Sequence, residues 1–233
     1  MELFEKPQKS RMIIGFPGFG LIGTITSEFL VEHLQTKLIG KILLKNMPST
    51  LAIHNGEIID PIGIYYNEKY NIVIIKGLIS LSGLEWEIAD EIKKIIDELN
   101  PYDITVIEGV ASPNPSEKTK IYYFSKNNEV KEKLSNFGYE PIKEGIILGV
   151  TSSLLLKIKR EINCIFAEAH SELPDSKGAA KIIEVLDKYL GLEVDNKPLL
   201  DQAEIFEKKL KGIYQNSETT KKEADKKSMS YVG

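Results

Sequence analysis

The chain has 233 residues, of which 42% are hydrophobic and 27% charged, and its formal net charge is −4. This balance is typical of a globular protein and excludes collagen-like, low-complexity and wholly disordered chains. The mild acidic charge gives no electrostatic reason to bind nucleic acid. No apolar stretch is long enough to suggest a membrane span, and the single cysteine, Cys164, favours a cytoplasmic protein.

Apolar strands and amphipathic helices are expected to alternate in the first part of the chain. A glycine-rich turn and an Asn55-Gly56 hairpin signal punctuate this part. The predicted elements are, in order, a strand at 12–14, the glycine-rich turn at 15–23, a helix from about 21 to 34, a strand at 38–44, the hairpin within 50–66, a strand at 71–75 and a helix at 84–99.

The second part continues the same alternation. Strands are predicted at 104–107, 121–124, 145–150 and 162–167, and helices at 129–136, 152–160, 176–190 and from Pro198 to about Ile213. This order predicts an α/β sandwich with a largely parallel sheet, to which the hairpin adds antiparallel character. The sequence therefore favours a single folded domain over residues 1–214.

Residues 215–233 differ in composition from the rest of the chain. They hold four Lys, two Glu and one Asp, and little that is apolar before Met229. Such a segment buries too little surface to offset its ordering entropy, which predicts a flexible C-terminal tail. Its last five residues, 229–233, regain apolar and aromatic character. They suit a docking peptide, although chance placement of Met229 and Tyr231 is the simpler alternative.

Glycines follow the first predicted strand and precede the first predicted helix. The sequence Gly18-Phe19-Gly20-Leu21-Ile22-Gly23 fits a dinucleotide-binding pattern, and the amino end of a helix suits anions. No acidic residue ends a second strand at the expected distance, however. Close packing of helix against strand explains the glycines equally well, so Gly18 and Gly20 remain candidates for ligand binding.

A second cluster follows the last predicted strand. Glu168 and His170 would share one face if that strand extends to them, and together they could form an acid–base or ligand-binding pair. With three His in the chain, a multi-histidine zinc site is not expected. Asp175 and Ser176 most simply cap the following helix. Cys164 lies in an apolar run and is expected to be a buried structural thiol.

The basic residues are almost entirely lysine. Only Arg11 and Arg160 are arginine among 30 basic residues. Enzymes that grip phosphate or carboxylate with two parallel hydrogen bonds usually use arginine for that purpose. The composition therefore disfavours a phosphate-clamping enzyme.

Three stretches in order resemble one known family. They are the glycine turn at 15–23, the segment from Met47-Pro48 through Asn55-Gly56 to Tyr66, and the segment from Ala167 through Pro174-Asp175 to Asp195. Together they resemble the archaeal proteasome assembly chaperone family, which is similar to the eukaryotic proteasome assembly chaperone 2 subunit. The resemblance covers about residues 10 to 214.

The resemblance implies a three-layer α/β/α sandwich that is phosphorylase- or hydrolase-like in fold, with no catalytic residues, cofactor or metal. It also implies homo-oligomers, with trimers and tetramers as candidates, and binding to the proteasome 20S core particle or its α subunits. In some members a C-terminal hydrophobic–Tyr–any-residue ending enters pockets between α subunits. Here Tyr231 is third from the end and Ser230 precedes it. The positions implied for partner binding are Met229, Tyr231, Val232 and Gly233.

The sequence thus favours a non-enzymatic proteasome assembly chaperone or proteasome-binding adaptor that docks partly through its C-terminal tail. No nucleic acid or membrane partner is expected. One alternative is a hydrolase or phosphorylase-like enzyme that binds a nucleoside-like molecule through the Gly15–Gly23 turn, Glu168 and His170, at the strand ends where α/β sheets place ligands. Another is a structural oligomer whose tail is incidental.

Overall fold

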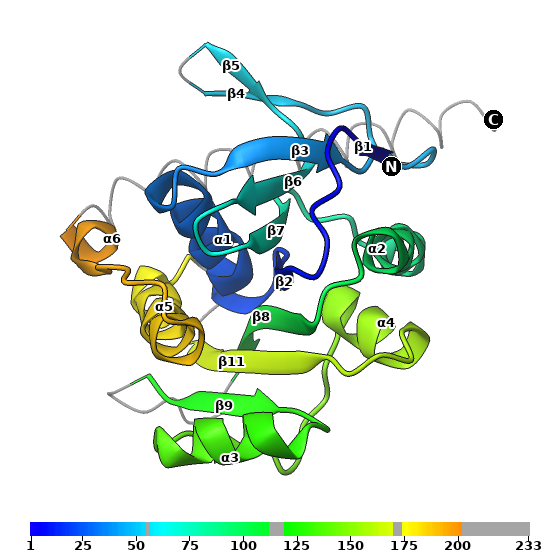
Figure 1. The fold of residues 1–233 in the computed structure, drawn as a ribbon. Coiled ribbons are helices and arrows are strands. Elements are labelled where there is room, and N and C mark those ends of the chain that lie inside the picture. Colours follow the sequence, from blue (N-terminus) through cyan, green and yellow to red (C-terminus); the bar gives the residue numbers. More distant parts are fainter. Residues whose placement is uncertain (55, 112–118, 170–173, 202–233) are drawn as a thin grey trace, which may run out of the picture.

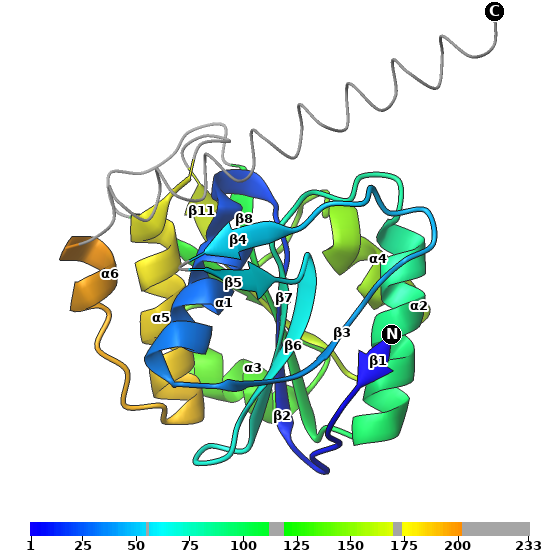
Figure 2. The ribbon, with the colours of Figure 1, turned by 90° about the horizontal axis from the view of Figure 1, so that it is seen from above.

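The computed structural model describes residues 1–54, 56–111, 119–169 and 174–201. In these residues the chain forms a nine-stranded sheet with helices on both faces (Figure 1). Figure 2 shows the sheet between a layer containing α1 and α5 and a layer containing α2 and α4. The predicted α/β class and the three-layer arrangement are confirmed.

The sheet is mixed, with a parallel centre. Its strand order is β1-β3-β6-β7-β2-β8-β11-β9-β10, and the four central strands, β7, β2, β8 and β11, run parallel. The strands are β1 (Glu2–Leu3), β2 (Arg11–Gly15), β3 (Lys37–Lys41), β6 (Ile62–Asn67), β7 (Ile72–Gly77), β8 (Asp103–Ala111), β9 (Ile121–Phe124), β10 (Glu140–Pro141) and β11 (Asn163–Ala169). Gly15 pairs with Lys76 on one side and Ile107 on the other, so these carboxyl ends form one edge.

The helices divide between the two faces of the sheet. Helices α1 (Ile22–His33), α3 (Asn128–Asn136), α5 (Ser176–Leu190) and α6 (Lys197–Asp201) contribute to the core on one face, and α2 (Glu85–Leu99) and α4 (Gly149–Lys157) to the core on the other. A short 3₁₀ helix, η1 (Phe19–Leu21), precedes α1. Asp175 caps α5 as predicted, because its side chain accepts a hydrogen bond from the Gly178 amide at 2.8 Å.

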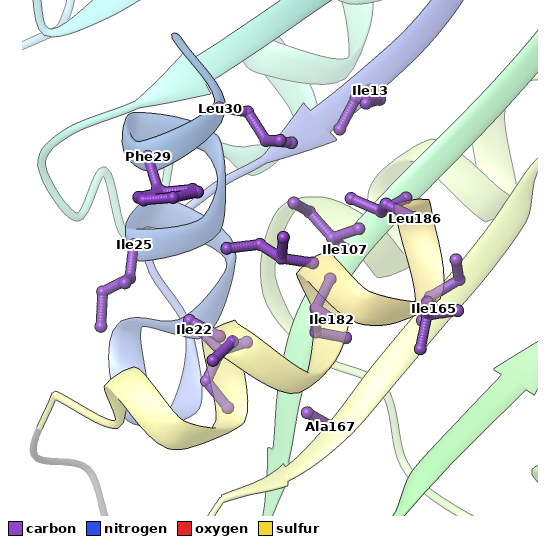
Figure 3. Packing of buried hydrophobic residues seen from close by; sticks show 14 of the residues in the cluster. Ile13, Ile22, Ile25, Phe29, Leu30, Ile107, Ile165, Ala167, Ile182 and Leu186 are labelled. Carbon is purple, nitrogen blue, oxygen red and sulfur yellow. The ribbon is translucent and has the colours of Figure 1, made fainter. Parts of the chain in front are cut away.

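Alternation along the strands builds both cores. Ile13 of β2 faces α1 and α5, while its neighbours Met12 and Ile14 face the opposite layer. Figure 3 shows α1 and α5 pressing Ile22, Ile25 and Leu30, and Ile182 and Leu186, onto the sheet. Cys164 is fully buried in the second core, as expected, and burial raises the pKa of its thiol.

A small hairpin stands apart from the main sheet. Strands β4 (Ala52–His54) and β5 (Glu57–Ile59) pair antiparallel and project beyond the β3 edge (Figures 1 and 2). The hairpin signal therefore marked a real hairpin, and Gly56 adopts φ 81° in its turn. Within the described ranges, no helix is long and apolar enough to cross a membrane.

One predicted element is wrong. The apolar run at 145–150 predicted a strand, but it has no regular structure until α4 begins at Gly149. The side chains of Ile146 and Leu148 are 88% and 64% exposed. Their apolar character therefore reflects the surface of the molecule and not a core strand. The predicted tail and most of the final helix lie outside the described residues.

Candidate functional site

At the carboxyl end of β2, the glycines of the turn allow close contacts between the main chain of the turn, of α1 and of β8. A Cβ on Gly15 would lie 2.4 Å from the Gly23 carbonyl oxygen, and one on Gly23 would lie 2.7 Å from the carbonyl oxygens of Phe16 and Ile107. The first turn of α1 is buried, with Ile22 and Thr24 at most 1% exposed. This packing supports the structural explanation of Gly15 and Gly23 over an open anion site.

The two glycines proposed as ligand contacts face different surroundings. Gly20 has φ 63°, and a Cβ there would lie 3.1 Å and 3.2 Å from the Cβ atoms of Asp175 and Ala169, so protein encloses it. The Asp175 amide also donates to the Gly20 carbonyl at 2.8 Å. Gly18, in contrast, faces the carboxylate of Glu108, with 2.8 Å between its ideal Cβ position and Glu108 Oε1.

Glu108 lies near the end of β8 and lines a pocket of about 430 Å³. The walls come from the end of β8, from Phe19 and Tyr122, and from the segment 140–148. Burial raises the pKa of Glu108 to about 7, although a hydrogen bond from Thr151 of α4 favours the ionised form. The Oε2 atom of Glu108 is buried and has no hydrogen-bond partner among the residues that the structure describes.

Of the predicted pair Glu168 and His170, the structure describes only Glu168. Glu168 lies on β11, pairs with Val110 of β8 and is 2% exposed. Strand β11 ends at Ala169, and His170 lies outside the described residues. Within those residues, no group of three or more His, Cys, Asp or Glu is arranged to hold a metal ion.

The sequence reasoning missed Glu108 as a site residue. Its position was visible, because a carboxylate directly follows the apolar run 104–107 of a predicted strand. What the sequence did not show is that α4 and the segment 140–148 close over that strand end. Both arginines lie away from this pocket: Arg11 donates to the Leu190 carbonyl at 2.9 Å, and Arg160 donates to Asn100 Oδ1 at 2.9 Å.

Apolar side chains are exposed on α2, on α4 and on the segment leading to α4. We call Trp86, Ile146, Leu148 and Leu156 the α2/α4 apolar group; they are 53%, 88%, 64% and 75% exposed. Helix α4 buries Leu154 together with Thr151 and Ser153, yet it leaves Leu156 exposed to solvent. Lys157 joins the two helices, with Nζ 2.6 Å from Asp90 Oδ1 and 5.8 Å from the centre of the Trp86 ring.

The projecting hairpin carries a second exposed apolar group. Ile53 and Ile58 are paired across β4 and β5 and are 70% and 68% exposed. Exposed apolar side chains that gather in this way commonly mark contacts with other proteins. The α2/α4 apolar group and this hairpin are therefore candidate interaction surfaces.

Comparison with known proteins identifies the family to which this chain belongs. The family model described as "PAC2 family" matches residues 12–213. The chain belongs to the PAC2 family. The described core, the glycine turn, Glu108 and both exposed apolar groups all fall inside the region of the PAC2 match, and this membership confirms the resemblance drawn from the sequence.

Solved structures of other proteins are similar to this chain in fold. The Pyrococcus furiosus protein PbaA, described as an archaeal homolog of proteasome-assembly chaperone, is 29% identical with a TM-score of 0.83, covering 94% of this chain and 97% of PbaA. P. furiosus PbaB, described as an archaeal proteasome activator, shares the fold at 20% identity and a TM-score of 0.73, covering 91% of this chain and 97% of PbaB. The Methanocaldococcus jannaschii protein MJ0106 is 28% identical over 216 residues, 90% of this chain and 86% of its own length.

The proposed docking residues cannot be placed in this fold. Met229, Tyr231, Val232 and Gly233 lie outside the described residues, as does the predicted boundary at 214/215. The tail and its docking peptide therefore stay predictions.

Proposed function

We propose that the protein is a proteasome assembly chaperone or proteasome-binding adaptor that acts without catalysis, as a homo-oligomer in the cytoplasm. The observation that carries this proposal is the similarity to PbaA, at 29% identity and a TM-score of 0.83 over nearly the whole chain. Membership of the PAC2 family over residues 12–213 supports it. The partners of such a protein would be the 20S core particle or its α subunits.

Exposed apolar side chains support a role in protein contacts. The α2/α4 apolar group and the Ile53/Ile58 pair together place six large apolar side chains in solvent, each more than half exposed. Leaving such side chains clustered on a monomer favours association. We assign the α2/α4 apolar group to contacts between copies of this chain, because α4 leaves Leu156 exposed beside the exposed side chains of the segment that leads to it, and the projecting hairpin to contacts with a client.

The tail would add a tethered contact. Four lysines and few apolar residues precede Met229 to Gly233, so the segment suits a linker that ends in a peptide with Tyr231 at its centre. In an oligomer several copies of this peptide would meet one ring of α subunits. Tethering raises the effective concentration of each later contact, so weak single contacts can give tight binding overall.

Binding to archaeal 20S core particles tests the proposal. Immobilised core particles, and separately α subunits, are incubated with the full chain and binding is followed by surface plasmon resonance. Saturable binding of the full chain supports the proposed function. Absence of binding to core particles, to α subunits and to partly assembled rings would contradict it.

Tail variants test the docking peptide separately. A chain ending at Ser228 and a Tyr231→Ala variant should bind at least tenfold more weakly, while a Ser228→Ala control should bind as the full chain does. Removal of Gly233 places Tyr231 second from the end and should strengthen binding. Equal binding by all four would reject tail docking and leave the chaperone proposal to rest on the folded domain.

A further inference from the structure

The pocket beside Glu108 has the size of a small-molecule site. Its volume is about 430 Å³, within the usual range for ligand pockets. It lies at the carboxyl end of β8, the edge of a parallel sheet where α/β proteins bind ligands. Most of its wall is apolar and comes from Phe19, Val110, Tyr122, Ile142 and Ile147.

One polar group inside the pocket lacks a partner. The Glu108 side chain lines the pocket, and its Oε2 atom is buried with no partner in the described ranges. A buried carboxylate oxygen without a hydrogen bond costs free energy, so a positive charge beside this carboxylate would be favourable. Because a Cβ on Gly18 would come within 2.8 Å of Oε1, only glycine at residue 18 leaves the carboxylate in this position.

The charges around the pocket favour a cation. Among the residues that the structure describes, the lining holds the carboxylates of Glu108, Glu140 and Glu144 and one lysine, Lys143, and no arginine. An anionic ligand would meet more negative than positive charge from these described side chains. The rings of Phe19 and Tyr122 also line the pocket, and aromatic faces attract organic cations.

From this geometry we propose that the pocket binds a small organic amine, an ammonium group on an apolar or aromatic body, through the carboxylate of Glu108. The ammonium pairs with the carboxylate of Glu108 where that side chain lines the pocket, and the apolar body packs against the wall between β8 and the segment 140–148. This binding does not rest on contacts with the proteasome, but Ile146 and Leu148 of the α2/α4 apolar group also line the pocket, so a contact between copies there would border the bound amine. It would make the PAC2 fold of this chain responsive to a metabolite-sized amine.

A matched set of probes tests the charge requirement. Isothermal titration calorimetry and thermal shift are run on the full chain with benzylamine, 2-phenylethylamine and tyramine. The alcohol 2-phenylethanol and the anion phenylacetate share the aromatic body and serve as controls. Saturable binding of at least one amine, at least tenfold tighter than both controls, supports the proposal. Binding of no amine, or equal binding of the alcohol, overturns it.

Variants place the binding at Glu108. Glu108→Gln keeps the shape of the side chain and should weaken amine binding at least tenfold. Glu132→Gln changes an exposed carboxylate on α3, outside the pocket, and should leave the affinity unchanged. Circular dichroism confirms that both variants are folded. A Glu108→Gln variant that is folded and binds the amine as the unchanged chain does would overturn the assignment.

Amine binding should release the proton of Glu108, which gives a further measurement. Binding by apolar packing alone would not release this proton. The groups that face Glu108 are Thr151 of α4 and Cys164 of β11, with Glu140, Lys143 and Glu144 along the lining. Since the pKa of Glu108 is raised to about 7, an amine that holds it ionised must displace its proton at lower pH. Amine affinity should therefore fall at least threefold between pH 7.5 and pH 6, and calorimetry in buffers of different ionisation enthalpy should show proton release. An affinity that does not change with pH would contradict the role of Glu108.

Discussion

Lys76 and Glu28 form an ion pair inside the protein, with Lys76 Nζ 2.5 Å from Glu28 Oε2 and with only 2% and 5% of their side chains exposed. The Tyr65 ring lies 4.9 Å from the same nitrogen. Burial of Lys76 opposes its charge, but Glu28 and Tyr65 outweigh burial and raise the pKa of the lysine. This ion pair links α1 to the carboxyl end of β7, beside the glycine turn.

Replacing one member of this pair should be strongly destabilising. Lys76→Met removes the ammonium that lies 2.5 Å from the buried Glu28 carboxylate and is expected to lower the free energy of unfolding by about 3–5 kcal/mol. The double variant Lys76→Met, Glu28→Leu removes both charges and should recover most of that loss. Urea unfolding of both variants measures the difference. A double variant no more stable than Lys76→Met would contradict the explanation from the broken ion pair.

The stability of the chain should fall as the pH rises from about 5 to 8. In the folded state the pKa of Glu108 is about 7, against an ordinary value of 4.5. The native state therefore holds a proton that the unfolded state has released, and the stabilisation is lost as the pH rises through 7. At 1.36 kcal/mol per pKa unit the fall is roughly 3 kcal/mol. Urea unfolding between pH 5 and pH 8 should show this slope in the unchanged chain and in Glu132→Gln, but not in Glu108→Gln.

Two glycines near the pocket should differ in their tolerance of alanine. A Cβ on Gly109 would lie 2.0 Å from the Phe19 carbonyl oxygen, which is backbone, whereas a Cβ on Gly18 meets the movable end of Glu108. Gly109→Ala should therefore cost more than about 3 kcal/mol, and Gly18→Ala about 1 kcal/mol. Thermal unfolding of the two variants compares them. Equal losses would show that the contact with Phe19 is relieved by movement of the turn.

The oligomeric state should depend on the α2/α4 apolar group. Leu156→Glu places a charge where α4 exposes an apolar side chain, and it should shift the molecular mass from oligomer to smaller species in size-exclusion chromatography with light scattering. Leu38→Glu, on β3, changes another exposed leucine and serves as the control. Trp86 is the only tryptophan in the chain, so its fluorescence reports the same dissociation. An unchanged mass for Leu156→Glu would place the contact elsewhere.

The cap of α5 should contribute a measurable share of stability. Asp175→Ala removes the acceptor for the Gly178 amide and is expected to cost about 1 kcal/mol. Asp97→Ala removes an exposed carboxylate that pairs with Lys93 one turn away, and it should cost less than about 0.5 kcal/mol. Chemical denaturation of both variants gives the comparison. A cost for Asp175→Ala no greater than that for Asp97→Ala would remove the cap as an important contact.

Much of the fold was predictable because local patterns and tertiary packing agree. The predicted bounds of β9 and α5 match the structure: 121–124 is a short run of Ile, Tyr and Phe, residues typical of strands, and the apolar stripe of α5 ends at Gly191. The run at 145–150 failed because its apolar residues face solvent and the pocket. Periodicity alone cannot distinguish an apolar surface segment from a core strand.

The candidate site was less predictable for a related reason. Glu108 becomes distinctive only when α4 and the segment 140–148 cover it, and these lie 32 or more residues away in the sequence. The two arginines lie away from this pocket. Their scarcity disfavoured a phosphate clamp, and in the structure both donate to groups just beyond or at helix ends, Leu190 of α5 and Asn100 after α2. Favourable contacts of cations with helix carboxyl ends explain that placement.

The burial of Cys164 has a practical consequence for experiments on the tail. The chain has one cysteine, it is fully buried, and its thiol has a raised pKa, so it reacts poorly with maleimide reagents. A Ser228→Cys substitution would therefore be labelled selectively with a fluorophore while the native thiol remains in place. Energy transfer between that dye and an acceptor on the α ring would then measure how far the end of the chain lies from the ring in each complex.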